Sequence, residues 1–313
     1  MRSGREWAAL AVGLLALAGC DSLEPEVTGA LEAAALERHL DVLADDSLYG
    51  RGAGSVYERR AAEYIRDEFV RYGLEPGAGD YFQEFSFGAG LQSQNVLGVL
   101  PGAGTLGSEW VIVGAHYDHL GWEQVTPDSI EVYNGADDNA SGTALLLELA
   151  RYLGHYYTLG EGAGHDRRSI MFHAYGAEEE GLLGSVHFCN NPTVIFENLA
   201  AMVDLDMVGR LRDDILVVNG AAAVPAWEAV LEGANTSELV LGFSDARLFG
   251  SDHVCFHRSD RPAIMLYTRS HSEYHTPADD VWLINLNGML RVGELALGVL
   301  QHVATDREWP ATP

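Results

Sequence analysis

Histidines and carboxylic acids recur in five separate segments of the chain, and such side chains bind divalent cations and carry protons in proteins. Four segments follow stretches that are typical of β-strands, and the fifth lies at the start of an apolar helix. They are His116 with Asp118, Asp137 with Asp138, Glu178 to Glu180, Asp204 with Asp206, and His275. Ligands of an open α/β sheet bind beyond the carboxyl ends of its strands, so we expect these side chains to meet at one edge of a sheet.

A cluster with this much negative charge needs a positive partner. Carboxylates on one edge would repel each other and raise each other's pKa values unless cations lay among them. Nitrogen and oxygen donors without cysteine suit zinc, with Co²⁺ or Mn²⁺ as substitutes and Ca²⁺ disfavoured by the histidines. His116 and His275 are far apart in the sequence, which suggests two ions with one histidine each and a carboxylate that bridges them. The sequence therefore predicts a site for two Zn²⁺ ions.

The adjacent acids Asp137 and Asp138 stand before an apolar helix predicted over residues 141–153. Alone, such a pair is typical of a helix N-terminus, where it caps free N–H groups and meets the positive end of the helix dipole. Together with the other four segments it favours a metal-bridging aspartate. Small neighbours such as Ala136 and Ala140 would let the backbone come close to the ions.

The elements that must position these residues follow an alternation of apolar strand, loop and helix that begins near Glu109. We expect strands over residues 110–116, 168–175, 199–207, 215–220 and 262–268, with helices near 141–153, 181–189, 225–234, 251–257 and 286–303. Two helices, over residues 35–46 and from 58 to a stop at Gly73, and two short strands, over 80–87 and 94–102, come before them. The predicted fold is α/β, a three-layer sandwich with a mixed, mostly parallel central sheet flanked by helices.

The N-terminal segment has the pattern of an export signal. Arg2 and Arg5 precede an apolar run that is too short to cross a bilayer as a stable helix. Leu17-Ala18-Gly19-Cys20 resembles a bacterial lipobox, which predicts a signal peptide over 1–19 and a lipid anchor on Cys20 that holds the protein to a membrane of the cell envelope. A plain signal peptide cleaved nearby is the alternative. Residues 20–30 would form a tether, and residues 31–313 a single domain.

Composition narrows the class of partner. Among 313 residues, 46 are acidic and 19 basic, and every basic residue is arginine. Nucleic acid is therefore excluded as a partner. The cysteines that remain, Cys189 and Cys255, lie among apolar neighbours, so we expect small buried core residues rather than a disulfide framework, although a bridge between them stays open.

Five motifs occur in a fixed order along the chain. They are AHYDHLG, NGADDNASG, AYGAEEEGLLGS, DLDMVG and SEYHTPADD. Together they resemble the M28 family of co-catalytic zinc aminopeptidases, from about Leu31 to the C-terminal helix. Each motif alone is weak, but five in order with suitable intervals are specific.

The resemblance implies a ligand set. Asp138 would bridge the two ions, His116 and Asp206 would complete one of them, and Glu179 and His275 the other. Motif alignment favours these residues, although Asp138 has an acidic neighbour on one side and Glu179 on both.

It also implies three residues that act on the reaction. Glu178 matches the family's general base, and Asp118 matches the acid that orients His116. Tyr274 is similar to a tyrosine that contacts the reacting carbonyl in some members. His119 and His253 neighbour motif positions, and we expect them to line the site without binding metal.

The implied activity is hydrolysis of N-terminal amino acids from peptides, by metal-activated water with a glutamate general base. Two alternatives remain: an acyltransferase like the glutaminyl cyclases, which share the fold and bind one zinc ion, and a lipid-anchored protein that binds metal or peptides without catalysis. A dipeptidase or carboxypeptidase variant of the family also stays open, as does the oligomeric state.

Overall fold

The computed structural model describes residues 30–247 and 250–309. The predicted signal peptide over 1–19, the lipid-modified Cys20 and nearly all of the tether lie outside these residues. Within the described part of the chain, no helix has the length and apolar character needed to span a membrane.

A nine-stranded mixed sheet forms the middle of the molecule, with strand order β1-β3-β7-β4-β8-β11-β9-β10 and β2 paired to β3. The strands are β1 (Glu75–Pro76), β2 (Phe82–Phe87), β3 (Leu91–Leu100), β4 (Trp110–His116), β7 (Ser169–Tyr175), β8 (Leu199–Leu205), β9 (Ile215–Asn219), β10 (Val240–Ser244) and β11 (Ala263–Tyr267). The four central strands β7, β4, β8 and β11 are parallel. Antiparallel pairs lie outside this centre, at β1, β2 and β3 on one side and between β11 and β9 on the other.

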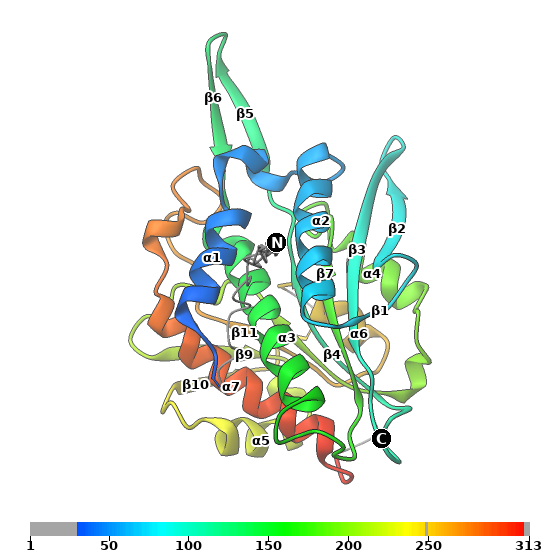
Figure 1. Ribbon diagram of the computed structural model, residues 1–313. Coiled ribbons are helices and arrows are strands. Elements are labelled where there is room, and N and C mark those ends of the chain that lie inside the picture. Colours follow the sequence, from blue (N-terminus) through cyan, green and yellow to red (C-terminus); the bar gives the residue numbers. More distant parts are fainter. Residues whose placement is uncertain (1–29, 248–249, 310–313) are drawn as a thin grey trace, which may run out of the picture.

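Helices cover both faces of the sheet (Figure 1). The larger core packs under α1 (Ala33–Leu43), α2 (Val56–Arg71), α3 (Gly142–Thr158), α5 (Ala226–Ala234) and α7 (Leu286–Thr305). The smaller core lies under α4 (Leu183–Asn190) and α6 (His253–Arg258). Because both faces are covered, β7 and β8 are buried along their whole length and read as apolar runs instead of alternating patterns. The predicted α/β fold, with a mixed sheet flanked by helices, is confirmed.

Local signals explain where α2 begins and ends. The Ser55 hydroxyl accepts hydrogen bonds from the N–H groups of Tyr57 and Glu58, which caps the first turn. The helix ends at Arg71, and Gly73 follows with a φ of 73°, a left-handed conformation that glycine adopts without steric cost. The stop predicted at Gly73 is confirmed.

Several short elements were not predicted from the sequence. A hairpin of β5 (Gly121–Thr126) and β6 (Ser129–Tyr133) projects from the body of the molecule (Figure 1). Its strands are exposed on both faces after Gly121, so they lack the apolar alternation that marks a half-buried strand. The single-turn elements are η1 (Asp46–Arg51), η2 (Ala136–Ser141), η3 (Phe196–Asn198), η4 (Ala221–Ala223) and η5 (Val281–Leu283).

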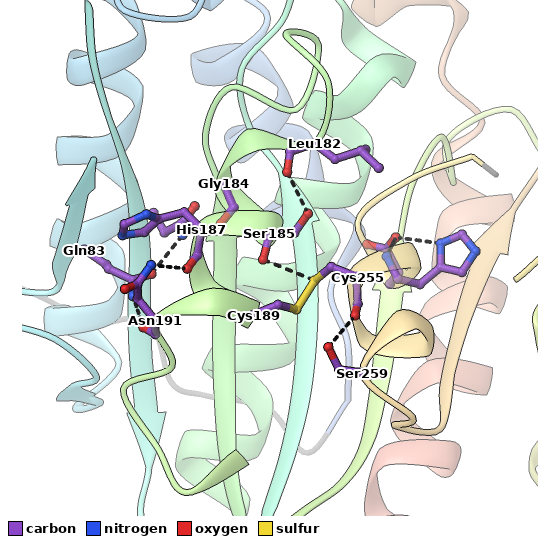
Figure 2. Close-up of a disulfide and its surroundings, with 12 residues drawn as sticks. Gln83, Leu182, Gly184, Ser185, His187, Cys189, Asn191, Cys255 and Ser259 are labelled. Carbon is purple, nitrogen blue, oxygen red and sulfur yellow. Dashed lines mark hydrogen bonds and ion pairs between the residues drawn. A yellow bond between two sulfur atoms is a disulfide. The ribbon is translucent and has the colours of Figure 1, made fainter. Parts of the chain in front are cut away.

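Cys189 and Cys255 form a disulfide that joins α4 to α6 on one face of the sheet (Figure 2). The expectation of small core residues rather than a disulfide is therefore wrong, and the bridge that the sequence left open is present. Both do lie in helices with apolar neighbours, as expected, and Cys255 is buried. The pairing depends on two short helices 66 residues apart in sequence meeting on the same face, and the local pattern around each cysteine does not reveal that.

Candidate metal centre

Parallel strands bring the predicted ligands to one edge of the sheet. β4 lies between β7 and β8, and all three run in the same direction. His116 is the last residue of β4, Asp206 follows the end of β8 by one residue, and Glu178 and Glu179 follow the end of β7 within four. The carboxyl ends of these neighbouring strands therefore gather four candidate side chains from three parts of the sequence.

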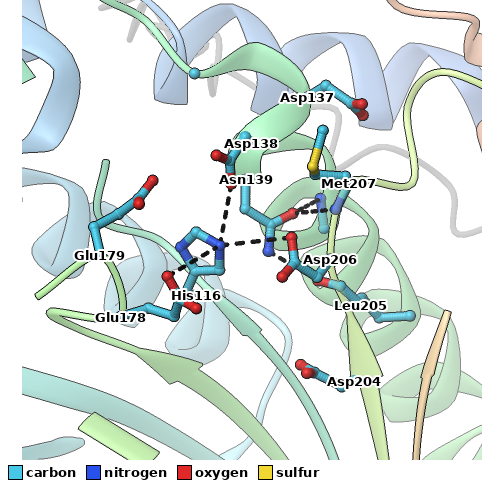
Figure 3. Close-up of polar contacts among 12 residues, drawn as sticks. His116, Asp137, Asp138, Asn139, Glu178, Glu179, Asp204, Leu205, Asp206 and Met207 are labelled. Carbon is cyan, nitrogen blue, oxygen red and sulfur yellow. Dashed lines mark hydrogen bonds and ion pairs between the residues drawn. The ribbon is translucent and has the colours of Figure 1, made fainter. Parts of the chain in front are cut away.

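Asp138 lies between the two predicted histidines, with one carboxylate oxygen facing each. Its Oδ1 atom is 3.3 Å from His116 Nε2, and its Oδ2 atom is 3.0 Å from His275 Nε2. His116 Nε2 also lies 3.6 Å from Asp206 Oδ1, and His275 Nε2 lies 3.2 Å from Glu179 Oε2. Figure 3 shows His116 at the centre of the contacts to Asp138, Asp206 and Glu178.

These separations suit metal ligands. Two donors at about 2.0–2.1 Å from a tetrahedral zinc ion lie about 3.3 Å apart. Two groups of donors each lie within 4.8 Å of one another: His116 with Glu178 and Asp206, and His119 with Asp138 and Glu179. Among the described residues, Asp138 Oδ2 and His275 Nε2 make no well-aligned hydrogen bond, although they are close to each other. The residues therefore fit a pair of divalent cations, because imidazole nitrogens lie close to both oxygens of the Asp138 carboxylate.

The pKa values of the cluster reflect its crowded charge. Burial alone would raise the pKa of Asp138, but the imidazoles of His116 and His275 hold it far below its ordinary value. Burial, together with the charges of Asp138 and Asp204, raises the pKa of Asp206. Burial opposes a charge on His116, yet the surrounding carboxylates raise its pKa well above the usual range. Without cations, the cluster therefore keeps extra protons to limit its own repulsion.

Glu178 lies beside the site, with its Oε2 atom 4.0 Å from His116 Nε2. Burial raises the pKa of this carboxyl well above its ordinary value, and the nearby acids Asp252, Asp206 and Asp118 add to the effect. A carboxyl group with a raised pKa next to a reaction centre is suited to accept and return a proton near neutral pH.

Asp118 is fully buried and holds the segment that carries both glutamates. Its carboxylate accepts hydrogen bonds from the N–H of Glu178 at 2.9 Å and from the N–H of Glu179 at 3.2 Å. Its contact with His116 is looser, at 3.8 Å between Oδ1 and Nδ1, while its backbone carbonyl lies 3.3 Å from the same nitrogen. Burial raises the pKa of Asp118 to about 6. The orientation of His116 thus involves the backbone of Asp118 as well as its side chain.

Asp137 is turned away from the metal donors and ties loops together. Its Oδ1 atom accepts hydrogen bonds from the N–H of Gly209 at 2.7 Å and from the hydroxyl of Ser141 at 3.1 Å. Its Oδ2 atom lies 3.1 Å from Nε2 of His271. With both oxygens engaged, Asp137 is not available to take the place of Asp138, which agrees with the motif alignment.

Three buried residues, Asp279, His119 and Arg51, support the site. His119 was expected to line the site, whereas no sequence pattern indicated the roles of Asp279 and Arg51. The Asp279 carboxylate accepts hydrogen bonds from the N–H groups of Asp137 and Asp138 at 3.0–3.1 Å. His119 Nδ1 lies 2.8 Å from Glu179 Oε1 and within the same donor group as Asp138. Because an ionised carboxylate only accepts, His119 donates to Glu179 here.

The third is Arg51, whose guanidinium is completely buried. It donates to the backbone carbonyls of Tyr117 at 2.8 Å, Asn134 at 2.7 Å and Gly135 at 3.1 Å, and also to Leu43. These carbonyls belong to the segments that lead into the ligand loops. Glycines on both sides of Arg51 were the only local sign in the sequence, and they do not point to a metal site.

Asp204 and Glu180, from the same five segments, also lie outside the two groups of metal donors within the described residues. Asp204 is buried and accepts a hydrogen bond from the N–H of His253, and it lies away from His116 in Figure 3. Glu180 is exposed, whereas Glu178 and Glu179 are partly buried. His253, as expected, belongs to neither group of metal donors within the described residues.

A cavity of about 220 Å³ opens directly onto the cluster. Met207, Asn219, Met265, Tyr267 and Tyr274 line it together with Glu178 and the candidate ligands His116, Asp138, Glu179 and Asp206. Tyr274 stacks on the His275 ring with 3.8 Å between the ring centroids, and its side chain is partly exposed. The structure thus places Tyr274 at the mouth of the site, next to the donor atoms.

An α/β sheet whose parallel strand ends gather two histidines and three carboxylates around a small cavity defines a metal-binding α/β protein. Its sequence matches Peptidase family M28 over residues 95–300. Aminopeptidase YwaD from Bacillus subtilis is 30% identical over 232 residues, which are 70% of this chain and 47% of that protein. Leucine aminopeptidase 1 from Sclerotinia sclerotiorum is 26% identical and covers 82% of this chain and 68% of that protein. The chain belongs to peptidase family M28, and it spans about half the length of YwaD.

Solved structures share the fold. BSAP, a zinc aminopeptidase from Bacillus subtilis, superimposes with a TM-score of 0.70 at 18% identity and covers 91% of this chain and 98% of that one. The aminopeptidase from Aneurinibacillus sp. strain AM-1 gives a TM-score of 0.69 at 19% identity, over 90% and 96% of the two chains. The architecture around the cluster is therefore that of known peptidase structures.

Proposed function

We propose that this protein is a zinc aminopeptidase with two metal ions, which removes N-terminal amino acids from peptides. The observation that carries the proposal is the position of Asp138, whose two oxygens face different histidines at 3.3 and 3.0 Å. His116 and Asp206 would complete one zinc site, and Glu179 and His275 the other. Co²⁺ and Mn²⁺ would fit the same mixed donors. Relatives and structural neighbours named as aminopeptidases support this activity.

Paired zinc ions would supply Lewis-acid chemistry here: they polarise the scissile carbonyl and lower the pKa of the attacking water. The chain's own residues do the rest. Glu178 accepts the proton of the water and passes it to the leaving amine. Asp118 fixes the backbone from which Glu178 and Glu179 project, and Tyr274 lies where its hydroxyl can contact the substrate carbonyl.

Cleavage at the N-terminus is supported by the size and charge of the site. A cavity of about 220 Å³ accommodates one amino-acid residue rather than an extended chain. Its carboxylates also attract the positive charge of a free α-amino group. A carboxypeptidase would instead need a cation for the terminal carboxylate, and no arginine of the described chain lines this cavity.

The test compares Glu178→Gln with Glu180→Gln, its exposed neighbour in the same run. We expect Glu178→Gln to keep two equivalents of zinc by elemental analysis and to lower kcat for leucinamide by about 10²–10⁴-fold. Glu180→Gln should keep both zinc content and kcat. Full activity in Glu178→Gln would refute the assigned role of this residue.

The same assay separates the alternatives. A glutaminyl cyclase-like enzyme would bind one zinc ion and cyclise an N-terminal glutamine peptide without releasing the residue. A non-catalytic binder would take up metal or peptide and hydrolyse neither leucinamide nor any peptide. Either outcome in the wild-type protein would replace the aminopeptidase proposal.

We also propose that the protein is exported and held at a membrane of the bacterial cell envelope through a lipid on Cys20. The disulfide between Cys189 and Cys255 supports export, because disulfides persist mainly in oxidising compartments. Metabolic labelling with a radioactive fatty acid should mark the wild-type protein and not Cys20→Ser. Equal labelling of the two would refute the anchor at this residue.

A further inference from the structure

A second hollow, of about 280 Å³, lies beside the metal centre and shares Glu179 with the first cavity. Three aromatic side chains line it: Tyr49 from η1, Tyr57 from α2 and Trp122 from the hairpin strand β5. We call the space that these three residues line the aromatic hollow. His119, which contacts Glu179, also lines it, so the hollow reaches the donor atoms of the predicted second zinc site.

The aromatic rings form a continuous surface. Tyr49 stacks on Tyr57 with 4.5 Å between ring centroids, and Trp122 meets Tyr49 edge-on at 6.3 Å. Trp122 remains 47% exposed and its neighbour Leu120 41% exposed, so much of this apolar surface faces solvent. Aromatic surface held open beside a reaction centre is suited to pack against an apolar side chain of a ligand.

The backbone that presents Tyr49 is held in an unfavourable conformation. Tyr49 and Arg51 have φ angles of 43° and 52°, in the left-handed region that costs a non-glycine residue about 1 kcal/mol or more. Gly50 between them has a φ of 64°, and a Cβ atom there would lie 2.1 Å from the carbonyl oxygen of Gly121. The guanidinium of Arg51 fixes this loop through its carbonyl contacts. Strain of this kind persists where a loop must present a particular side chain.

We propose that the aromatic hollow binds the residue on the leaving side of the scissile bond and favours a large aromatic or aliphatic side chain there. The inference rests on the proposed aminopeptidase function. If the first residue of a peptide fills the cavity of about 220 Å³, the next residue must extend from the metal centre into a neighbouring space. The hollow is a space of this kind, because it shares Glu179 with that cavity.

Charge at the rim extends the inference to substrate length. Glu180 lines the hollow and is exposed. The free carboxylate of a dipeptide would lie near this acid and be repelled, whereas an amidated dipeptide or a longer peptide places no charge there. The preferred substrates are therefore peptides of three or more residues with an apolar second residue.

The experiment compares kcat/KM for Leu-Phe-amide, Leu-Ala-amide and leucinamide, which has no second residue. We expect the wild-type protein to prefer Leu-Phe-amide over Leu-Ala-amide by about tenfold or more, since the phenyl ring buries additional apolar surface. Trp122→Ala and Tyr57→Ala should each reduce this ratio to about threefold or less, mainly through KM. Trp122→Phe should restore most of it.

Trp282→Ala is the matched control, because Trp282 is 76% exposed and lines neither cavity. It should keep the wild-type ratio. The wild-type protein could hydrolyse leucinamide in a reaction that a chelator inhibits, and yet show a ratio near one. That result would refute the proposed role of the aromatic hollow while the aminopeptidase function stands. Preference retained in both Trp122→Ala and Tyr57→Ala would overturn it as well. Failure to hydrolyse any of the three substrates would overturn both proposals.

Discussion

At the scale of single residues, two adjacent aspartates show how identical side chains take different tasks. Asp138 directs its oxygens toward two histidines, while Asp137 binds the N–H of Gly209 and lies against His271. The backbone of this pair is held in place by Asp279, whose carboxylate accepts hydrogen bonds from the N–H groups of both aspartates. The bridging geometry therefore depends on an acid that touches no metal donor itself.

Asp279→Asn should weaken metal binding. An amide keeps the size of the side chain but accepts the two N–H groups less strongly, so Asp138 loses part of its orientation. We expect zinc affinity to fall by about 10–100-fold, measured by competition with a chromophoric chelator. Asp280→Asn is the control, because Asp280 caps the N–H of Val281 and makes no contact with the ligand loop. Equal affinities in the two variants would contradict the positioning role of Asp279.

His39 provides a residue-scale prediction about pH, far from the metal centre. Burial, followed by the positive charge of Arg38, lowers the pKa of His39 from 6.5 to about 3, and Nδ1 lies 2.7 Å from the hydroxyl of Tyr64. Because the folded pKa lies below the unfolded value, the unfolded chain binds this proton first. The contribution to stability is therefore complete above pH 6.5 and is lost as the pH falls toward 3.

When the pH falls from 7.5 to 5, the titration of His39 alone should lower the free energy of unfolding by about 2 kcal/mol. His39→Gln has no such titration. The difference in the free energy of unfolding between the wild-type protein and the variant should therefore narrow by that amount, measured by urea unfolding at both pH values. A difference that stays constant with pH would show that His39 protonates equally in both states.

At the scale of elements, the disulfide joins two helices that contribute little core of their own. α4 and α6 are the short helices over one face of the sheet, and Cys189 and Cys255 link them across 66 residues of sequence (Figure 2). A loop of that length loses about 4 kcal/mol of unfolded-state entropy when it is closed.

The double variant Cys189→Ser with Cys255→Ser should therefore be less stable by about 4 kcal/mol, measured by urea unfolding. A reductant should lower the stability of the wild-type protein toward that of the variant and leave the variant unchanged. If the reductant destabilised both proteins equally, the effect would not come from this bond.

The strands differ in how well the sequence predicts them. His116 ends β4, and Glu178 and Asp206 follow β7 and β8. These strands are buried apolar runs, and such a run indicates both that a strand is present and roughly where it ends. Polar residues just past those ends could therefore be assigned to one edge of the sheet. The hairpin β5–β6 could not, because its side chains face solvent on both sides and leave no periodic signal.

The contacts of the supporting residues could not be predicted for a different reason. His119 contacts Glu179 across 60 positions, Asp279 contacts Asp137 across 142, and Arg51 reaches the carbonyl of Asn134 across 83. Each contact exists only after the loops at the sheet edge have packed together. A single sequence gives the residue type in each case and nothing about its partner.

At the scale of the whole molecule, negative charge is spread along the chain and is also concentrated in the cluster at the sheet edge. The formal net charge of the chain is −27, and the cluster at the sheet edge adds buried carboxylates at separations below 5 Å. Surface repulsion is spread out and is screened by salt, whereas buried repulsion is screened much less. These two contributions can be separated experimentally, because only the buried one responds to metal.

Removal of metal should therefore lower thermal stability in a way that salt does not restore. At a free zinc concentration 1,000 times the dissociation constant, binding to the folded state contributes about 4 kcal/mol. For a chain of this size we expect Tm to fall by about 10 °C when a chelator removes the metal, and to recover when zinc is added back, measured by differential scanning calorimetry. Raising NaCl to about 0.5 M should increase Tm of both forms by screening surface charge, while the gap between them remains. Asp138→Asn, which loses the carboxylate proposed to bridge the two ions, should show a much smaller gap. A chelated protein that matched the zinc-loaded protein at equal ionic strength would show that the clustered acids are tolerated without cations, and the metal centre would have to be abandoned.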